Sequence, residues 1–150
     1  MEQQVDETRF DQARLQRPRT VVLLIILTAL FVSRVVGFFL LASVGELPDG
    51  APESWFIPFL GDGLIGISAI VIAIFLWRRS TFGVWLAVVI FHSIALFDTV
   101  MAGVNNIREP WDASPLGDMI GLGFGFLILV SVVSLYLLSR ADVRRYYGVQ

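Results

Sequence analysis

The sequence predicts an all-α membrane protein, a bundle of four transmembrane helices with both termini in the cytoplasm. Composition gives the class: 56% of the 150 residues are hydrophobic and 16% are charged. With a mean hydropathy of +0.75, the chain is too apolar for a soluble domain of this size. The lengths of its hydrophobic runs give the number of helices, and the distribution of arginine gives their orientation.

Four apolar runs are long enough to cross a bilayer. A hydrocarbon core of about 30 Å needs about 20 helical residues, each rising about 1.5 Å. The first run contains Arg34 and is longer than the apolar core of a cleaved signal peptide, so we interpret it as a span. We therefore expect a polar leader at 1–19, a transmembrane domain at 20–139 with spans at 20–44, 55–77, 81–104 and 116–138, and a basic tail at 140–150.

Positive charge lies mainly on one side of the predicted bundle. Arginines precede the first span, fill the link between the second and third, and follow the fourth: Arg9, Arg14, Arg17, Arg19, Arg78, Arg79, Arg140, Arg144 and Arg145. Only Arg108 falls in a loop on the other side. Because cytoplasmic flanks carry the excess of positive charge, both termini are expected inside. The use of arginine without lysine indicates a bacterial source, and hence the bacterial cytoplasmic (inner) membrane.

Tryptophan and tyrosine occur where the ends of the spans are expected. Such aromatic residues are enriched at the two membrane interfaces. We therefore expect Trp55 and Trp111 at the outer interface and Trp77 and Trp85 at the inner interface. Tyr146 and Tyr147 indicate that the tail also touches the membrane surface.

Two segments of the chain resemble each other. "PFLGDGLIG" begins at Pro58 and "PLGDMIGLG" begins at Pro115, and each is expected at the outer end of the second helix of a helical hairpin. This placement predicts a duplicated hairpin with halves related by an axis along the membrane normal, as in parallel transporter repeats. The first and third spans align poorly.

Small residues form a stripe on the second and on the fourth predicted helix. Such stripes let another helix approach closely, and the GxxxG pattern is typical of tight contact in lipid. We predict that the second and fourth helices pack on each other. The alternatives are a lipid or ligand groove at these small residues and a dimer through the same glycine face. The residues concerned are Gly66, Ala69 and Ala73, which follow Asp62 on one face, and Gly117, Gly121 and Gly125.

Ionisable residues inside the spans are the most informative feature of the sequence. An ionised group at the bilayer centre costs about 2.5 to 3.5 kcal/mol on insertion scales, so it normally faces the bundle interior, pairs or carries function. We expect Asp62 and Asp98 to converge in the outer half, with Arg34 reaching toward them from near the midplane. Two interpretations remain open: a buried salt bridge that fixes helix register, or a site at which the surplus carboxylate binds an ion or ligand.

Two further ionisable residues are candidates for the same site. His92 is also near the midplane, but six residues from Asp98 and so about 120° around the helix, which excludes a ligand pair on one face. We interpret His92 as a neutral imidazole bonded to a carbonyl of a neighbouring helix, with a proton relay or ligand as the alternative. Asp118 is favoured at the first turn of a helix by the exposed N–H groups there.

Several classes of function are excluded by residue type. The absence of cysteine excludes disulfides, thiolate metal sites and iron–sulfur clusters. A single histidine in the chain cannot supply bis-histidine haem ligation or a histidine-rich zinc site. The chain has a net charge of −2 and no cluster of basic residues, so the sequence predicts no basic surface that could bind nucleic acid. We predict no catalytic residue, metal or cofactor, because no reaction motif has a supporting context.

Three functions remain open on this evidence. The first is a non-enzymatic scaffold or accessory subunit with a buried Asp/Arg network. The second is a protein that binds or translocates a cation, a proton or a small apolar molecule, using Asp62 and Asp98. The third is a membrane enzyme with Asp/His acid–base chemistry. The expected partners are the lipid bilayer and either further copies of the chain or another membrane protein.

The overall plan is similar to that of the DoxX-like group of small bacterial membrane proteins. The resemblance covers residues 20 to 145 and rests on four spans, the arginine turn, the "PFLGD" start of the second span and the basic tail. The first helix ends in "LLASVGELP", where many members carry His-Gly-x-x-Lys. The resemblance implies a four-span bacterial membrane protein, and no functional residue is carried over from it.

Overall fold

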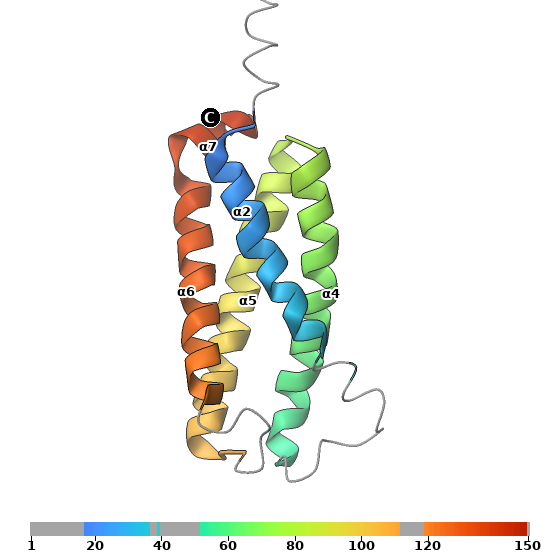
Figure 1. Cartoon of the computed structure of the whole chain (residues 1–150), viewed down its shortest axis with the longest axis vertical. Coiled ribbons are helices and arrows are strands. Elements are labelled where there is room, and N and C mark those ends of the chain that lie inside the picture. Colours follow the sequence, from blue (N-terminus) through green and yellow to red (C-terminus); the bar gives the residue numbers. More distant parts are fainter. Residues whose placement is uncertain (1–16, 37–38, 40–51, 112–118, 150) are drawn as a thin grey trace, which may run out of the picture.

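Every regular element of the described chain is helical. The computed structural model describes residues 17–36, 39, 52–111 and 119–149. These residues form α2 (Arg19–Leu30), η1 (Phe31–Arg34), η2 (Glu53–Trp55), α4 (Phe56–Arg78), α5 (Phe82–Arg108), α6 (Met119–Ser139) and α7 (Ala141–Tyr146) (Figure 1). The predicted all-α class is confirmed.

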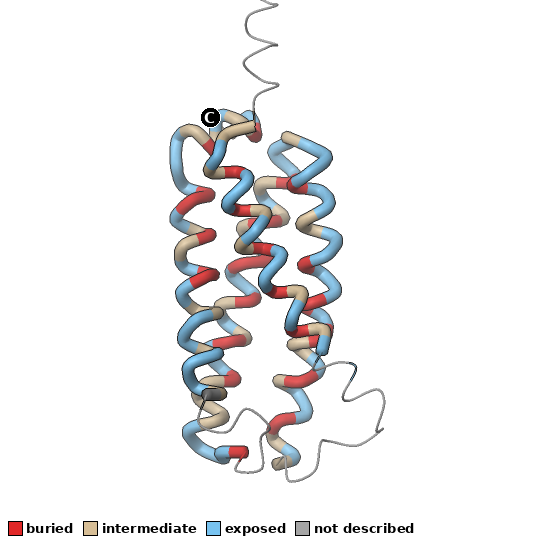
Figure 2. The backbone as a smooth tube through the Cα atoms, viewed as in Figure 1, coloured by how far each residue is buried: buried red, intermediate tan, exposed pale blue. Residues whose placement is uncertain are grey.

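Three helices are long and apolar enough to cross a membrane. They cover Glu53–Arg78, Phe82–Arg108 and Ile120–Ser139, and match the predicted runs 55–77, 81–104 and 116–138. The first predicted run, 20–44, is represented by α2 and η1, which lie against α4, with α2 also against α6 (Figure 1). Many large apolar side chains of these helices face outward (Figure 2), as contact with lipid requires.

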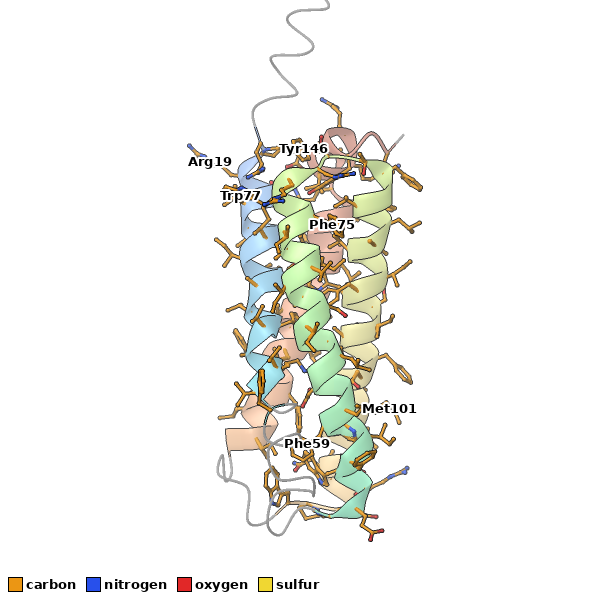
Figure 3. The ribbon with its side chains drawn as sticks, turned by 90° about the vertical axis from the view of Figure 1, so that its right-hand side faces the viewer. Arg19, Phe59, Phe75, Trp77, Met101 and Tyr146 are labelled. Carbon is orange, nitrogen blue, oxygen red and sulfur yellow. The ribbon has the colours of Figure 1, made fainter. Side chains whose placement is uncertain are left out.

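The two ends of the bundle differ in chemistry. The start of α2, the link between α4 and α5, and α7 share one end, where Arg19, Trp77 and Tyr146 lie (Figures 1 and 3). We call it the arginine end. The Arg17 guanidinium lies 4.3 Å from the centroid of the Trp77 ring, and its Nη2 donates to the Trp77 carbonyl at 2.5 Å. This pair fixes the segment before α2 to the end of α4.

The opposite end, called the tryptophan end, is closed by an aromatic cluster of Trp55, Phe59 and Trp111. The ring centroids of Trp55 and Trp111 are 6.0 Å apart, and both side chains are buried. Trp55 Nε1 donates to the Glu109 carbonyl at 2.9 Å. Their rings and the Trp55 N–H therefore find partners within the protein, and the interfacial position of these two tryptophans stays a prediction.

The C-terminal segment folds back onto the bundle. Val143 and Tyr147 are buried in a cluster at the arginine end with Val21, Leu76 and Leu138. Within the described part of the chain, the Tyr147 hydroxyl has no hydrogen-bond partner, and burial raises its pKa. Tyr147 thus packs inside the protein, whereas the sequence predicted that it would lie at the membrane surface.

The small residues of α4 form the surface on which α2 and η1 pack. A Cβ added at Gly66 would lie 2.5 Å from the backbone nitrogen of Val35, the residue that follows η1. Gly66 and Ala69 are buried, and Ala73 is half-buried. Glycine is therefore required at 66 by the close approach of the chain at Val35, and the partner of this stripe is not the helix that we predicted.

The glycines of α6 face outward. Gly121 and Gly125 are exposed, and among the described residues no heavy atom lies within 4 Å of a Cβ built at either. The buried stripe of α6 contains Val130, Ser131 and Ser134 and packs mainly against α5. The prediction of a close contact between these glycines and the second helix is therefore wrong, and Gly117 lies outside the described residues. The duplicated hairpin stays a prediction, because its second motif overlaps residues 115–118.

Candidate functional site

Arg34 is placed in the interior by a short stretch of tighter helix. The chain changes from α-helix to 3₁₀-helix at Phe31, and Arg34 is the last residue of that stretch. A 3₁₀ turn has three residues rather than 3.6, so it changes the direction in which the following side chains project. The Arg34 side chain is 4% exposed and reaches both α4 and α5.

Arg34, Asp62 and Asp98 form an ionic triad. The guanidinium contacts Asp62 Oδ1 through both Nε and Nη2. Nη2 also donates to Asp98 Oδ2 at 2.5 Å. The three residues belong to η1, α4 and α5. One side chain thus links three elements, and the predicted convergence of the two carboxylates on Arg34 is found.

Thr99 is a further hydrogen-bond partner of the guanidinium. Its hydroxyl donates to the Ala95 carbonyl at 2.7 Å and accepts from Arg34 Nη1 at 3.3 Å. Thr99 was not predicted as a site residue. Its position beside Asp98 was the available signal, because a buried guanidinium needs acceptors for all its N–H groups.

The triad has more negative than positive charge. One guanidinium faces two carboxylates, which gives a net charge of −1 when all three groups are ionised. The side chains of Asp62 and Asp98 are 27% and 21% exposed, whereas Arg34 is enclosed. The arrangement can therefore hold helices together, and its carboxylates can also accept a further proton, cation or hydrogen-bond donor.

Gly61 makes room for Asp98. A Cβ added at Gly61 would collide with Asp98 Oδ1, so a larger residue there would displace this carboxylate. Gly61 was part of the repeated Leu-Gly-Asp motif but was not predicted as a site residue. Its role depends on the facing helix, which the sequence does not reveal.

His92 occupies a separate, fully buried position. Its Nε2 lies 3.1 Å from Thr28 Oγ1, and that hydroxyl donates to the Leu24 carbonyl at 2.8 Å. Nε2 and the Thr28 hydroxyl form a hydrogen bond whose direction is set by the imidazole tautomer. Nδ1 has no partner among the described residues. The predicted neighbouring-helix partner is present, but it is a hydroxyl rather than a carbonyl.

An apolar layer separates His92 from the triad. Phe31 lies between Thr28 and Arg34 in the chain, and Ala95 lies between His92 and Thr99 on one face of α5. Both are fully buried in a cluster completed by Ile65, Ala69, Phe91 and Val130. The structure therefore brings Arg34, Asp62 and Asp98 together and leaves His92 apart. Asp118 lies outside the described residues.

Neither a metal site nor a known relative accounts for this arrangement. In the described ranges, no group of three or more His, Cys, Asp or Glu side chains is placed to hold a metal ion. Comparison of the chain with family models, curated proteins and solved structures found no match. The site must therefore be interpreted from its own geometry.

Proposed function

We propose that this chain is a four-span integral protein of the bacterial cytoplasmic membrane, with a non-catalytic role as a scaffold or accessory subunit. In this role, the ionic triad fixes the relative positions of its helices. The observation that carries the proposal is the set of contacts that Arg34 makes with Asp62, Asp98 and Thr99 on α4 and α5.

A triad of this kind favours a fixed bundle. Removing one partner of a buried ion pair costs about 3 to 5 kcal/mol, because the remaining charge is left uncompensated. The apolar layer next to the triad packs Phe31 and Phe91 edge to face, with ring centroids 5.7 Å apart. These features support a rigid element on which other copies or partners can assemble.

The number of spans and their orientation are part of the proposal. The apolar run that contains α2 and η1 continues to residue 44, which gives it the length of a span. The segments at the arginine end carry Arg17, Arg19, Arg78, Arg79, Arg140, Arg144 and Arg145, and the positive-inside rule assigns that end to the cytoplasm. The DoxX-like resemblance supports the same plan.

The scaffold role can be tested by cysteine crosslinking in native membranes, because the chain has no cysteine of its own. Gly121→Cys probes the outward glycine face of α6, and Val71→Cys on the exposed face of α4 is the control. A disulfide-linked dimer formed by Gly121→Cys alone supports self-assembly. A chain that stays monomeric by native mass spectrometry and retains no partner contradicts the scaffold role.

Binding of a cation or proton is a second candidate, favoured by the negative charge of the triad and the partial exposure of both carboxylates. The charge-free variant Arg34→Gln/Asp62→Asn/Asp98→Asn keeps hydrogen-bonding groups at all three positions. A bound cation stabilises the folded state by mass action. Stabilisation of the wild type, but not of this variant, by a monovalent cation supports the second candidate. Equal behaviour of both proteins supports the scaffold.

A further inference from the structure

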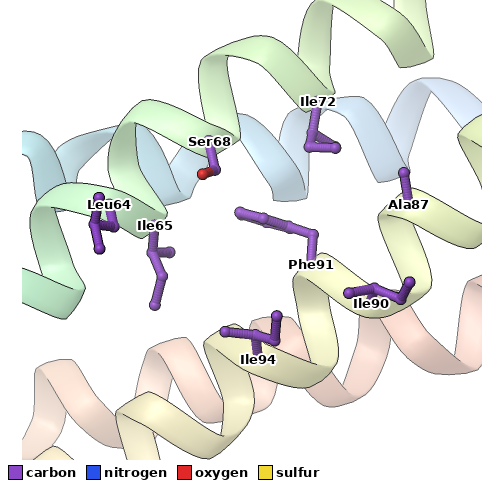
Figure 4. Close-up of a pocket in the computed structure, with 8 residues that line it drawn as sticks. All are labelled: Leu64, Ile65, Ser68, Ile72, Ala87, Ile90, Phe91 and Ile94. Atoms are coloured by element: carbon purple, nitrogen blue, oxygen red, sulfur yellow. The ribbon is translucent and has the colours of Figure 1, made fainter.

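A groove opens between α4 and α5 on the outside of the bundle. Its volume is about 370 Å³, within the usual range for ligand sites. Its walls include Ile65, Ser68 and Ile72 of α4 and Ala87, Phe91 and Ile94 of α5. Figure 4 shows Phe91 projecting from α5 toward α4. The lining is almost wholly apolar, which suits a hydrocarbon chain.

The ionic triad lies beyond one end of this groove, about one helical turn past its lining residues. On α4, the stripe Ile65, Ser68 and Ile72 continues to Gly61, one turn toward the tryptophan end. On α5, the stripe through Ala87, Phe91 and Ile94 continues to Asp98. These two continuations meet, because Asp98 Oδ1 packs over Gly61 so closely that a Cβ added there would collide with it. A carboxylate therefore lies one helical turn beyond the apolar lining.

Asp98 has the chemistry to select a head group. Arg34 engages Oδ2, and among the described residues Oδ1, which packs over Gly61, has no hydrogen-bond partner, so Oδ1 can accept from a second donor. With one guanidinium against two carboxylates, a cation is the complementary charge and an anion is repelled. Asp98 lies ten residues from the end of α5, about 15 Å along the helix, so a head group that contacts it lies well below that end of the helix.

We propose that the groove and Asp98 form one binding site for a single-chain aliphatic primary amine. The hydrocarbon chain lies between α4 and α5, and the ammonium group donates to Asp98 Oδ1. The inference goes beyond the scaffold role and does not require it.

The probe is hexadecylamine with a photoreactive diazirine in its chain, added to purified protein in phosphatidylcholine nanodiscs. Peptide mass spectrometry then maps the label. We expect labelling concentrated on residues 64–72 and 87–94. A hydrogen bond to a charged group contributes about 1.5 to 3 kcal/mol, so unlabelled hexadecylamine should compete at least about tenfold better than hexadecanol, and palmitate should compete least.

Two variants separate the parts of the site. Asp98→Asn keeps the Arg34–Asp62 pair but removes the surplus charge, so the preference for amine over alcohol should fall to near unity while labelling of the groove persists. Ala87→Phe fills the groove without touching the triad and should abolish labelling by every probe. Ala29→Phe, on the exposed face of α2, is the matched control and should label like the wild type.

Three results would overturn the inference: labelling spread evenly over the exposed face of α6, equal competition by amine and alcohol in the wild type, or unchanged labelling of Ala87→Phe. The wild-type competition and Ala87→Phe decide the matter even if Asp98→Asn does not fold. Failure here leaves the scaffold role intact, because that role is tested by crosslinking at Gly121.

Discussion

Arg34 and Asp98, which are 64 positions apart in the chain, meet through an Nη2–Oδ2 contact of 2.5 Å between η1 and α5. Together with the contacts of Arg34 to Asp62, this pairing makes the arginine the shared partner of two acidic side chains. Its removal should therefore affect more of the structure than the loss of either aspartate.

Arg34→Met should destabilise the protein by about 3 to 5 kcal/mol, because Asp62 and Asp98 would face each other without a counter-charge. Denaturation in mixed detergent micelles measures the loss. Arg34→Met/Asp62→Asn/Asp98→Asn should recover more than half of it, since no buried charge remains. A single variant as stable as the wild type would show that the triad does not hold the helices.

Gly66→Ala should cost about 1 to 3 kcal/mol, as overpacking does, because the new Cβ would lie 2.5 Å from a backbone atom of Val35. Thermal unfolding in detergent provides the measurement. Gly125→Ala is the control, since nothing in the described structure lies within 4 Å of its Cβ position. The gain in helix propensity is at most about 1 kcal/mol, so this control should be neutral or slightly stabilised. Equal effects at both sites would contradict the close approach of the first helix.

Thr28→Val should cost about 1 to 3 kcal/mol, because it leaves the buried His92 Nε2 without its hydrogen-bond partner. His92→Leu should cost less, since it removes an imidazole whose Nδ1 already lacks a partner in the described structure. A double-mutant cycle tests the pair: once His92 is Leu, the second substitution should add almost nothing. Simple additivity would indicate that these side chains do not interact.

Asp142 gives the arginine end a weak dependence on pH. A hydrogen bond from Thr20 at 2.6 Å, followed by interactions with Arg140, lowers the pKa of this carboxyl below its usual value. A lowered folded-state pKa gives stabilisation that is present above the unfolded-state pKa and is lost as pH falls through the folded-state pKa. The effect should be small, because the pair is exposed.

The expected readout is the difference in Tm between the wild type and Asp142→Asn, which keeps an acceptor for Thr20 but has no charge. This difference should be constant near neutral pH and should shrink in acid below about pH 4. A difference that grew on acidification would have the wrong sign for a carboxylate stabilised in the folded protein.

The features that follow from the membrane acting as the solvent could be predicted from the sequence. The lengths of the apolar runs predicted the three long helices, because a span must bury its own backbone hydrogen bonds over a fixed thickness. The meeting of Arg34 with Asp62 and Asp98 followed for the same reason, since isolated charges are costly in hydrocarbon. Neither prediction needed to know how the helices are arranged.

Features that depend on the arrangement were missed. The small residues around Gly66 showed which face of their helix another segment can approach closely. They did not show that this segment is the chain at Val35. Thr28 was not predicted as the partner of His92, because hydroxyls on an apolar helix can also bond to their own backbone. The Glu109 carbonyl was not predicted as the partner of the Trp55 N–H, because the place of Trp55 at the end of a span does not reveal which loop folds over it.

The apolar layer around Phe31 and Ala95 has an electrical consequence. A membrane potential falls mainly across material of low dielectric constant, and a full crossing is worth about 2.3 kcal/mol per elementary charge at 100 mV. The apolar layer lies on the arginine side of Asp98, and the buried aromatic cluster of Trp55, Phe59 and Trp111 lies on the other side. A cation that reaches Asp98 from the tryptophan end therefore crosses only part of the field, so its occupancy should depend on voltage less than that of an ion that crosses the whole membrane.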